Sequence, residues 1–568
     1  MIASSFPAQG RVLHYYRCLL QAFGTQPVAV TLQQLADLCC CTRRHLRTVL
    51  GQLQQQGWIS WQASAGRGKR ASLQCLREEA ALQRWQAEQL LMKGQVEEAM
   101  ALTGVAPSEW VQLLLGRAGQ VMEGEQQILR VPYYRSLPTL DPGQPLRRSE
   151  VHLIRQIFNG LTAINEENGE VVADLAHHWQ PISNCCWRFY LRPGVRWHDG
   201  GWLCIEDVLA SLDALRRLPL YRHLLSVSSP APRQIDINLQ QPDERLPWLL
   251  AQYPAMIRPL SRMAVMPADR PVGTGPYRVV ENTAQRLRLQ AFDDYFGYRA
   301  LLDEVDIWMW PALAGQMAIG EGHVCGLRLE GQTDESVRRE LVLEQGGYFL
   351  LYDAHGPAAL SACQRAALQQ QLGPWQLMQA IPEPIRRRWT PATSLLPQWL
   401  HTLSTSPAPN DSGWPAQLHM AYCAQQPEYR TLASWISRQL AAVGIEVICN
   451  ELPFAQWWRG EGCADIWLGS ITFSTPPETA LAAWLCGTPL LRSRLADTGE
   501  DQVMAWLAAW RAGTLTPEAL MAQVMQAGRL QPLFHHWLEL QGPPQVRGAR
   551  LNDLGWFDFR RVWLAADG

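Results

Sequence analysis

The stretch Thr31-Leu-Gln-Gln-Leu-Ala-Asp-Leu-Cys-Cys-Cys-Thr-Arg-Arg-His-Leu-Arg-Thr-Val-Leu-Gly-Gln-Leu-Gln-Gln-Gln-Gly57 decides the fold of the first part of the chain. Thr31 is a good helix N-cap, and the apolar spacing after it predicts a short helix that ends at the three cysteines. Thr42 then caps a second predicted helix, which runs to about Gln56 and stops at Gly57. Two helices joined by such a tight turn indicate a helix-turn-helix.

The second predicted helix has an apolar face and a basic face. Its inward positions recur at i, i+3, i+4 and i+7, and they are Leu46, Val49, Leu50 and Leu53. The opposite face of its first two turns carries Arg43, Arg44, Arg47 and Thr48. A recognition helix contacts base edges with its N-terminal residues, and the arginine fork matches the O6/N7 pair of guanine. We therefore expect these four residues to bind DNA.

A predicted β-hairpin follows the second helix. Strands expected at residues 58–63 and 71–76 flank a tip whose two glycines permit a tight turn. The cations of the tip are Arg67, Lys69 and Arg70. A hairpin in this place makes a winged helix, whose wing touches phosphates or the minor groove. Residues 1–76 are therefore predicted to be an α+β winged helix-turn-helix domain that binds DNA.

Charge is distributed unevenly along the chain. Residues 1–75 carry eight cationic side chains and one acidic side chain, Asp37, whereas the whole chain has a net charge of −2. A small basic module on a mildly acidic body indicates a polyanionic partner, here the double-stranded DNA of a promoter operator. The alternative is that the arginines are an ordinary solvated face. That alternative does not explain the near absence of acids.

The remainder of the chain is predicted to be a helical linker and a large α/β body. With 568 residues the chain is too long for one core, and about three or four compact units are expected. Residues 77–125 have helical spacing. From residue 126, strands alternate with helices, which predicts more than one lobe. Strands are expected at 128–131, 187–191, 235–239, 287–290, 305–308 and 348–352, and helices at 151–161, 206–218, 427–443 and 501–512.

The sequence gives no sign of a membrane segment or an export signal. No apolar run reaches the ~18 residues that span a bilayer, and the longest candidate, residues 246–257, is interrupted by prolines. Residues 1–25 lack the basic start and apolar core of a secretory signal. We therefore expect a cytoplasmic protein with no membrane partner.

Neither metal binding nor catalysis is expected. The chain has 14 cysteines but no paired C-x-x-C spacing, so reduced and mostly packed thiols are predicted. The pairs His177-His178 and His535-His536 are adjacent in sequence and point different ways, which suits structural roles better than one shared ion. No nucleophile–base pattern stands out. No cofactor is predicted.

Several segments of the body resemble one protein family. The segments are residues 150–162, 174–179, 187–200 and 272–277, the last being Val-Gly-Thr-Gly-Pro-Tyr. In this order they are similar to motifs of the family 5 extracellular solute-binding proteins for oligopeptides, dipeptides and nickel. The resemblance implies that residues 126–568 form a bilobal, type II periplasmic-binding-protein-like sensor domain.

The full chain resembles the SgrR-type transcriptional regulators, the bacterial activators of the glucose-phosphate stress response. The resemblance extends over residues 41–48, 62–70, 157–170 and 554–559. It implies a cytoplasmic DNA-binding sensor that activates a small regulatory RNA gene and represses its own gene. The implied partners are promoter DNA, a small-molecule ligand such as a sugar phosphate, and RNA polymerase.

The candidate ligand residues lie near one segment of the body. Peptide receptors keep an aspartate that pairs with the ligand's amino terminus, and Phe473 or Ser474 stands at that place here. Loss of that anion removes repulsion toward a phosphate. Trp457 and Trp467 lie close by in sequence and are candidates to stack on a sugar, with core packing as the alternative. The predicted ligand-binding residues are Trp457, Trp467, Phe473 and Ser474.

Two other functions remain open at this point. One is a cytoplasmic or anchored solute-binding protein of a peptide-type transport system, whose basic head is incidental. The other is an enzyme on the same scaffold. DNA binding in a mobility-shift assay separates a regulator from both.

Overall fold

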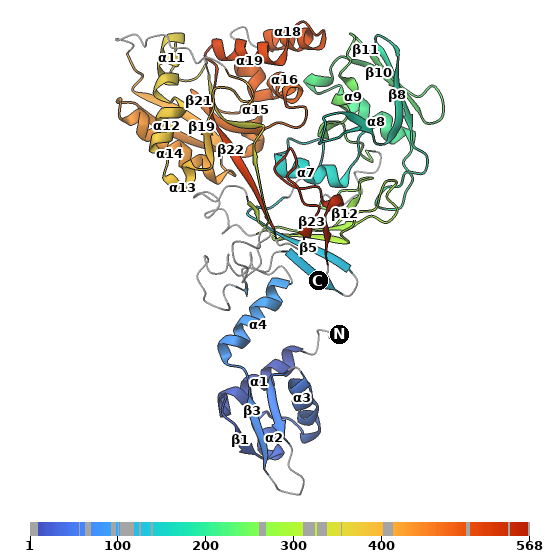
Figure 1. The fold of residues 1–568 in the computed structure, drawn as a ribbon, viewed down its shortest axis with the longest axis vertical. Coiled ribbons are helices and arrows are strands. Elements are labelled where there is room, and N and C mark those ends of the chain that lie inside the picture. The colour runs from blue at the N-terminus through green and yellow to red at the C-terminus, as the bar shows by residue number, and fades with distance from the viewer. Residues whose placement is uncertain are drawn as a thin grey trace. The chain divides into compact units, whose positions relative to one another are not determined.

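The chain forms two compact units, Met1–Trp110 and Val111–Gly568 (Figure 1). The structure is a computed structural model, and it describes residues 9–55, 57–62, 70–92, 98–99, 102, 119–123, 126–137, 140–260, 269–309, 324–326, 338–353, 355–400, 413–495, 500–542 and 546–565. Across these ranges, no helix has the length and apolar character needed to cross a bilayer.

The first unit is a winged helix built on a small antiparallel sheet. The sheet has the strand order β1-β3-β2. In chain order, the elements of the first unit are α1 (Gln9–Phe23), β1 (Val28–Val30), α2 (Leu32–Leu38), α3 (Arg43–Gln55), β2 (Ile59–Gln62), β3 (Ala71–Cys75) and α4 (Glu79–Met92). The predicted helix-turn-helix and the two strands of the hairpin are therefore confirmed. The hairpin tip lies outside the described residues, except for Arg70.

Local sequence signals set the ends of the two central helices. Thr31 caps α2 in a capping box with Gln34, and Thr42 Oγ1 accepts a hydrogen bond from the backbone N–H of His45 at 3.3 Å. Gly57 has a φ of +70°, the left-handed conformation that ends a helix at little steric cost. Thr31, Thr42 and Gly57 are the caps and the stop that the sequence predicts.

The core of the first unit includes a helix that the sequence analysis did not assign. The predicted inward residues of α3 are all buried, and they pack with Tyr16 and Leu19 of α1. Tyr16 meets the Trp58 ring edge-on at 5.0 Å, and its hydroxyl donates to the Arg77 carbonyl at 2.6 Å. Helix α1 is therefore an integral part of the winged helix.

The segment between residues 77 and 125 is only partly helical. Helix α4 matches the predicted helix, whereas Gly119–Glu123 forms strand β4. This strand pairs antiparallel with β5 (Gln126–Tyr133), with Val121 opposite Ile128. The prediction of helix is therefore wrong for these five residues, because a neighbouring strand supplies their backbone hydrogen bonds. Residues 103–118 of this segment, for which helical spacing was also predicted, lie outside the described residues.

The first lobe of the second unit contains a two-stranded sheet, β6-β7, and two larger sheets. One sheet has the order β12-β13-β14-β5-β4 and the other β10-β11-β9-β8. Strands are β6 (Thr162–Ile164), β7 (Val171–Ala173), β8 (Ala176–Ser183), β9 (Cys186–Leu191), β10 (Leu224–Ser228), β11 (Gln234–Leu239), β12 (Tyr277–Asn282), β13 (Arg286–Ala291) and β14 (Glu304–Met309). Helices are α7 (Arg148–Ile157), α8 (Ile205–Leu215), η1 (Pro219–Tyr221), α9 (Leu246–Leu249) and η2 (Tyr253–Ala255).

The second lobe is built on an eight-stranded mixed sheet with the path β15-β22-β17-β21-β19-β20. Its strands are β15 (Val324–Gly326), β16 (Arg338–Leu343), β17 (Gly346–Tyr352), β18 (Trp389–Pro391), β19 (Gln417–Cys423), β20 (Glu446–Leu452), β21 (Ile466–Thr472) and β22 (Leu530–Gly542). Its helices are α11 (Ala362–Gln371), α12 (Pro374–Ala380), α13 (Glu383–Arg386), α14 (Pro427–Ala441), α15 (Phe454–Arg459), α16 (Pro477–Gly487), α17 (Pro489–Arg494), α18 (Glu500–Arg511) and α19 (Pro517–Gln526).

The chain passes from the first lobe to the second and then returns. After β22, the C-terminal segment carries β23 (Val546–Arg547), η5 (Phe559–Arg561) and β24 (Trp563–Leu564). It packs on the first lobe, where the Tyr277 hydroxyl donates to the Phe559 carbonyl at 3.1 Å. Figure 1 shows this return: the dark red C-terminal end lies beside the green strands of the first lobe. All six predicted strands of the body are present, which confirms the multidomain fold with a bilobal α/β body.

Helix α7 ends earlier than predicted. The sequence predicts helix over 151–161, but Phe158 is extended, with φ −121° and ψ 162°. The reason is tertiary. The Val-Gly-Thr-Gly loop approaches the end of α7 so closely that a Cβ on Gly273 would lie 1.9 Å from the carbonyl oxygen of Ile157. Gly275 N donates to that same oxygen at 2.8 Å. Only glycine permits this contact, because any Cβ at position 273 would clash with the Ile157 carbonyl oxygen.

Candidate functional site

The basic face of the winged helix is formed as predicted. Arg43, Arg44, Arg47 and Thr48 are all exposed on the first two turns of α3. Within the described part of the chain, no ion pair involves these three arginines. Thr48 Oγ1 donates a hydrogen bond to the Arg44 carbonyl at 3.4 Å. The three guanidinium groups are thus ready to meet phosphates or base edges.

Other cations of the first unit have different surroundings. Arg17 on α1 donates to Glu79 at 3.2 Å and to Gln86 at 2.7 Å, which ties α1 to α4. Arg70 is exposed at the start of the strand that returns from the wing. Arg67 and Lys69 lie outside the described residues. The DNA-binding role of all these predicted residues stays a prediction.

A cavity of about 380 Å³ lies in the second unit, between the two lobes. The first lobe contributes Tyr134, Arg135, Pro142, Gly143, Gln144, Pro145, Leu146, Arg147, Arg148, Ser149, Val151, Arg155, Leu218, Pro219, Leu220, Tyr221, Trp248, Gln252, Tyr253, Pro254 and Leu554. The second lobe contributes Glu344, Tyr348, Cys423, Gln426, Glu428, Tyr429, Phe454, Trp457, Trp458, Ser470, Ile471, Thr472, Phe473, Ser474, Ala480, Ala483, Trp484, Gly487, Thr488, Pro489 and His536.

Aromatic rings form much of the cavity wall. Phe454 and Trp457 on α15 stack nearly parallel at 6.4 Å. Phe473 contacts the edge of Trp484 at 5.6 Å, and Trp248 adds a further ring from the first lobe. Flat apolar surfaces with a few polar groups between them are typical of sites for small organic molecules, sugars included.

Two arginines of the wall share one buried carboxylate. Arg135 makes two hydrogen bonds to Glu150, at 2.6 and 2.8 Å, and Arg147 donates to the same carboxylate at 3.1 Å. Burial alone would raise the pKa of Glu150, but the charges of Arg135 and Arg147 outweigh it, and the pKa lies below its ordinary value. Arg147 also lies over the ring of Phe454, at 5.5 Å, and so joins the two lobes.

A second ion pair crosses between the lobes. Arg148 Nη1 on α7 donates to Glu344 Oε1 at 3.1 Å, and the Thr472 hydroxyl at the end of β21 donates to the same oxygen. Glu344 is buried, whereas the Arg148 side chain keeps 19% exposure. Arg148 therefore reaches the cavity with its charge already balanced.

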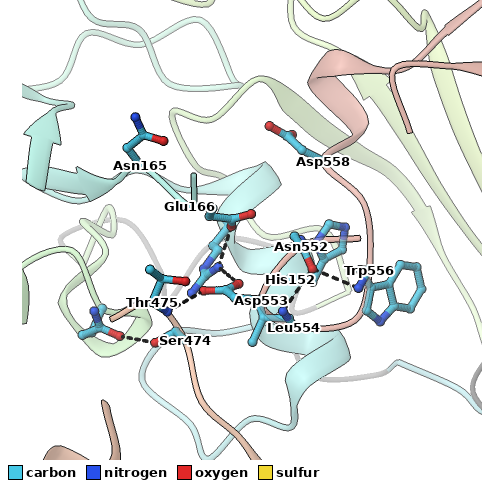
Figure 2. A network of polar contacts seen from close by, with 12 residues as sticks. His152, Asn165, Glu166, Ser474, Thr475, Asn552, Asp553, Leu554, Trp556 and Asp558 are labelled. Carbon is cyan, nitrogen blue, oxygen red and sulfur yellow. Dashed lines mark hydrogen bonds and ion pairs between the residues drawn. The ribbon is translucent and has the colours of Figure 1, made fainter. Parts of the chain in front are cut away.

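The second arginine of α7 sits in a wider polar network (Figure 2). Arg155 Nη1 donates to Glu166 at 2.8 Å and to Asp553 at 2.7 Å. The other oxygen of Asp553 accepts a hydrogen bond from the backbone N–H of Thr475 at 3.0 Å. Figure 2 shows Glu166, Asp553 and Thr475 converging on this point from three chain segments. The network joins α7, the β6–β7 turn and the C-terminal segment to the second lobe.

The carboxylates of this network are not equivalent. Burial and the charge of Asp553 raise the pKa of Glu166 to about 7, although Arg155 acts in the opposite direction. Nearby, burial lowers the pKa of His152 to about 3, so this histidine is neutral at physiological pH. Its Nδ1 is 3.2 Å from Asn552 Nδ2.

The structure places the predicted ligand residues in two settings. Trp457, Phe473 and Ser474 line the cavity, and Ser474 Oγ donates to Gln252 at 3.4 Å. Trp467 is fully buried on β21 and is absent from the cavity wall. The guanidinium of Arg494 lies over its ring at 5.9 Å. The ligand-binding role of the four residues stays a prediction.

Several wall residues were missed by sequence reasoning, notably Trp248, Arg148, Arg155, Glu344 and Trp484. Their partners lie far away in sequence: Arg155 and Asp553 are 398 positions apart. The one usable signal was the spacing of Arg148 and Arg155, which are seven positions apart and so lie on one face of a helix; the predicted helix began at residue 151 and did not include Arg148.

Metal and disulfide chemistry find no support in the described ranges. No cluster of three or more His, Cys, Asp or Glu side chains there could hold a metal ion. Every cysteine in those ranges is a free thiol. Burial raises the pKa of Cys39 and Cys75 to about 11, so both are neutral thiols.

The fold and these sites define a class: a winged-helix protein joined to a bilobal domain of the periplasmic-binding-protein type. Residues 11–125 match the model of the sugar transport-related sRNA regulator N-terminal domain. Residues 170–326 match the middle part of the family 5 bacterial extracellular solute-binding proteins.

Known proteins agree with this class over almost the whole chain. The HTH-type transcriptional regulator SgrR of Salmonella typhi is 42% identical over 561 residues, covering 98% of this chain and 99% of that protein. The chain therefore belongs to the SgrR family of HTH-type transcriptional regulators.

Solved structures match the second unit. NikA from Brucella suis has a TM-score of 0.61 at 16% identity, covering 77% of this chain and 99% of NikA. The murein tripeptide-binding protein MppA of Escherichia coli has a TM-score of 0.60 at 16% identity, covering 78% of this chain and 99% of MppA. At this identity the likeness establishes the fold alone.

Proposed function

We propose that the chain is a cytoplasmic transcriptional regulator that binds promoter DNA through its winged helix and a sugar phosphate through the cavity between its lobes. It activates a small-RNA gene during glucose-phosphate stress and represses its own gene, with RNA polymerase as a further partner. The proposed division is a DNA-binding domain, a linker and a sensor domain.

One observation carries the DNA-binding part of the proposal. Arg43, Arg44 and Arg47 stand exposed at the start of α3, without an ion-pair partner in the described ranges. Cations gathered on one helix face without acidic partners are the electrostatic footprint expected of a surface that meets a polyanion. The position of these cations, at the N-terminal end of the second helix, suits major-groove contacts.

The ligand part is supported by the composition of the cavity wall. Its rings offer stacking surfaces for a sugar, and Arg148 and Arg155 bring guanidinium hydrogen-bond donors to its edge, although each is already paired with a carboxylate. Phe473 and Ser474 add no carboxylate where peptide receptors keep one, so an anionic ligand meets less repulsion. A cavity of about 380 Å³ suits a ligand of that size.

Fluorescence anisotropy of the full chain on labelled promoter fragments tests this function. We expect salt-sensitive binding to a fragment upstream of its own gene, and a change in affinity when glucose 6-phosphate is added. The triple Arg43→Ala/Arg44→Ala/Arg47→Ala variant should lose specific binding. Absence of any DNA binding would instead favour a solute-binding protein with an incidental basic head. Turnover of a sugar phosphate would favour an enzyme.

A further inference from the structure

Arg155 donates hydrogen bonds to two carboxylates from a single nitrogen. Both hydrogen bonds come from Nη1, to Glu166 and to Asp553. Nε and Nη2 of Arg155 make no hydrogen bond to the described residues. The side chain is 20% exposed and lines the cavity. The unbonded nitrogens are thus available to a ligand in that cavity, and an anionic group is the partner that a guanidinium prefers.

The charges around Arg155 do not balance when both carboxylates are ionised. One cation then faces two anions, and the Asp553 side chain is only 5% exposed. Other charged groups nearby do not correct this, because Asp558 and Arg560 pair with each other at 2.7 Å and His152 is neutral. Two ionised carboxylates on one guanidinium therefore leave the network with one excess negative charge.

Glu166 is the better place for a neutralising proton. Both oxygens of Asp553 already accept hydrogen bonds, one from Arg155 at 2.7 Å and the other from the backbone N–H of Thr475 at 3.0 Å. Glu166 has no such donor in the described ranges besides Arg155, and its side chain is 32% exposed, so a proton can reach it. Its neighbour Glu167 points to the surface instead and pairs with Arg561 at 2.6 Å.

We propose that the cavity binds its anionic ligand at Arg155 together with one proton, and that Glu166 carries this proton. The inference rests on the proposed function, because it concerns the same ligand cavity. An anion beside Arg155 would be a third negative charge in the network. Ligand and proton therefore bind cooperatively, since each lowers the electrostatic cost of the other.

The direction of the pH effect follows from this coupling. Glu166 has a pKa raised to about 7 by burial and by Asp553, so it is about half protonated near neutral pH. A bound anion raises that pKa further. Ligand affinity should then be nearly constant below pH ~6 and should fall as pH rises through 7, by about tenfold between pH 6 and pH 8.

Isothermal titration of the full chain with glucose 6-sulfate tests the proposal, because a sulfate ester does not itself titrate between pH 6 and pH 8. At pH 8, the heat in buffers of different ionisation enthalpy should report uptake of about one proton. Glu166→Gln should bind with almost no proton uptake. The matched control Glu167→Gln removes a neighbouring carboxylate of the same turn and should behave as the wild type.

The outcomes separate this inference from the proposed ligand. Binding of glucose 6-sulfate by the wild type without proton uptake would overturn the inference and leave the sugar-phosphate ligand standing. If neither glucose 6-sulfate nor glucose 6-phosphate binds, the proposed ligand is wrong, and titration with inorganic sulfate decides the inference. The inference is supported if inorganic sulfate binds with uptake of a proton and Glu166→Gln abolishes that uptake. Any other result with sulfate overturns the inference.

Discussion

Replacing Arg44 or Arg47 of α3 by alanine separates DNA affinity from protein stability. Both side chains are exposed and have no ion-pair partner in the described ranges, and alanine is as good a helix former as arginine. The free energy of unfolding should therefore change by less than about 0.5 kcal/mol. If the side chain reads a guanine, specific affinity should fall by ~1–3 kcal/mol, which is about 5- to 150-fold.

Anisotropy titrations on operator and unrelated DNA, over a range of salt, measure this loss. If the replaced arginine reads a base, the alanine variant loses affinity for the operator alone. If the replaced arginine binds a phosphate, the variant binds all DNA more weakly, and the slope of log affinity against log salt concentration falls by about 0.9. Arg17→Ala is the matched control, because it removes the same charge from a side chain held by Glu79 and Gln86. An unchanged operator affinity in the triple α3 variant would refute the recognition-helix assignment.

Three further results follow from the structure. Ser474→Asp puts a carboxylate into the cavity wall and should weaken glucose 6-phosphate binding by about tenfold, measured by calorimetry with Ser474→Asn as the neutral control; an equal effect of both variants would contradict the charge argument. Burial raises the pKa of Asp174 to about 7, so between about pH 4 and pH 7 the native protein holds a proton that the unfolded chain releases. The free energy of unfolding should therefore fall as pH rises from about 4 to about 7. Asp174→Asn should flatten that part of the pH profile measured by urea unfolding. Since the described cysteines are free thiols, strong reductant should leave the melting temperature and operator affinity unchanged, and a large loss on reduction would mean a disulfide.

The sequence predicts best where the signals are local. The caps at Thr31 and Thr42, the glycine at 57 and the apolar spacing of α3 act within one or two turns, and the structure confirms them. Strand positions in the body were also predictable from short apolar runs. Helix α1 was not assigned, although Tyr16 and Leu19 on it are fully buried.

The candidate cavity was only partly predictable, because distant segments build it. On β21, the four consecutive residues from Ile466 to Gly469 are buried, so both faces of the strand are covered there and burial alternation carries no information about which residues face a ligand. This is why Trp467 and Phe473 look equally suitable in sequence, although only Phe473 lines the cavity. The contact between Arg155 and Asp553 depends on the chain returning to the first lobe, which no local pattern encodes.

The two cationic surfaces of this protein are prepared for anions in opposite ways. The arginines of α3 are exposed and lack ion-pair partners in the described ranges, so DNA binding gains from phosphate contacts and from the counterions that they release. Each of the cavity arginines Arg135, Arg148 and Arg155 already holds a carboxylate at 3.1 Å or less. An anion that enters the cavity therefore gains little from net charge and depends on shape, on stacking and on protonation of a carboxylate. Because buried charges are screened little by salt, added salt should weaken DNA binding steeply and ligand binding only slightly. Under the proposed function, that difference allows the chain to respond to a small anion while it is bound to DNA.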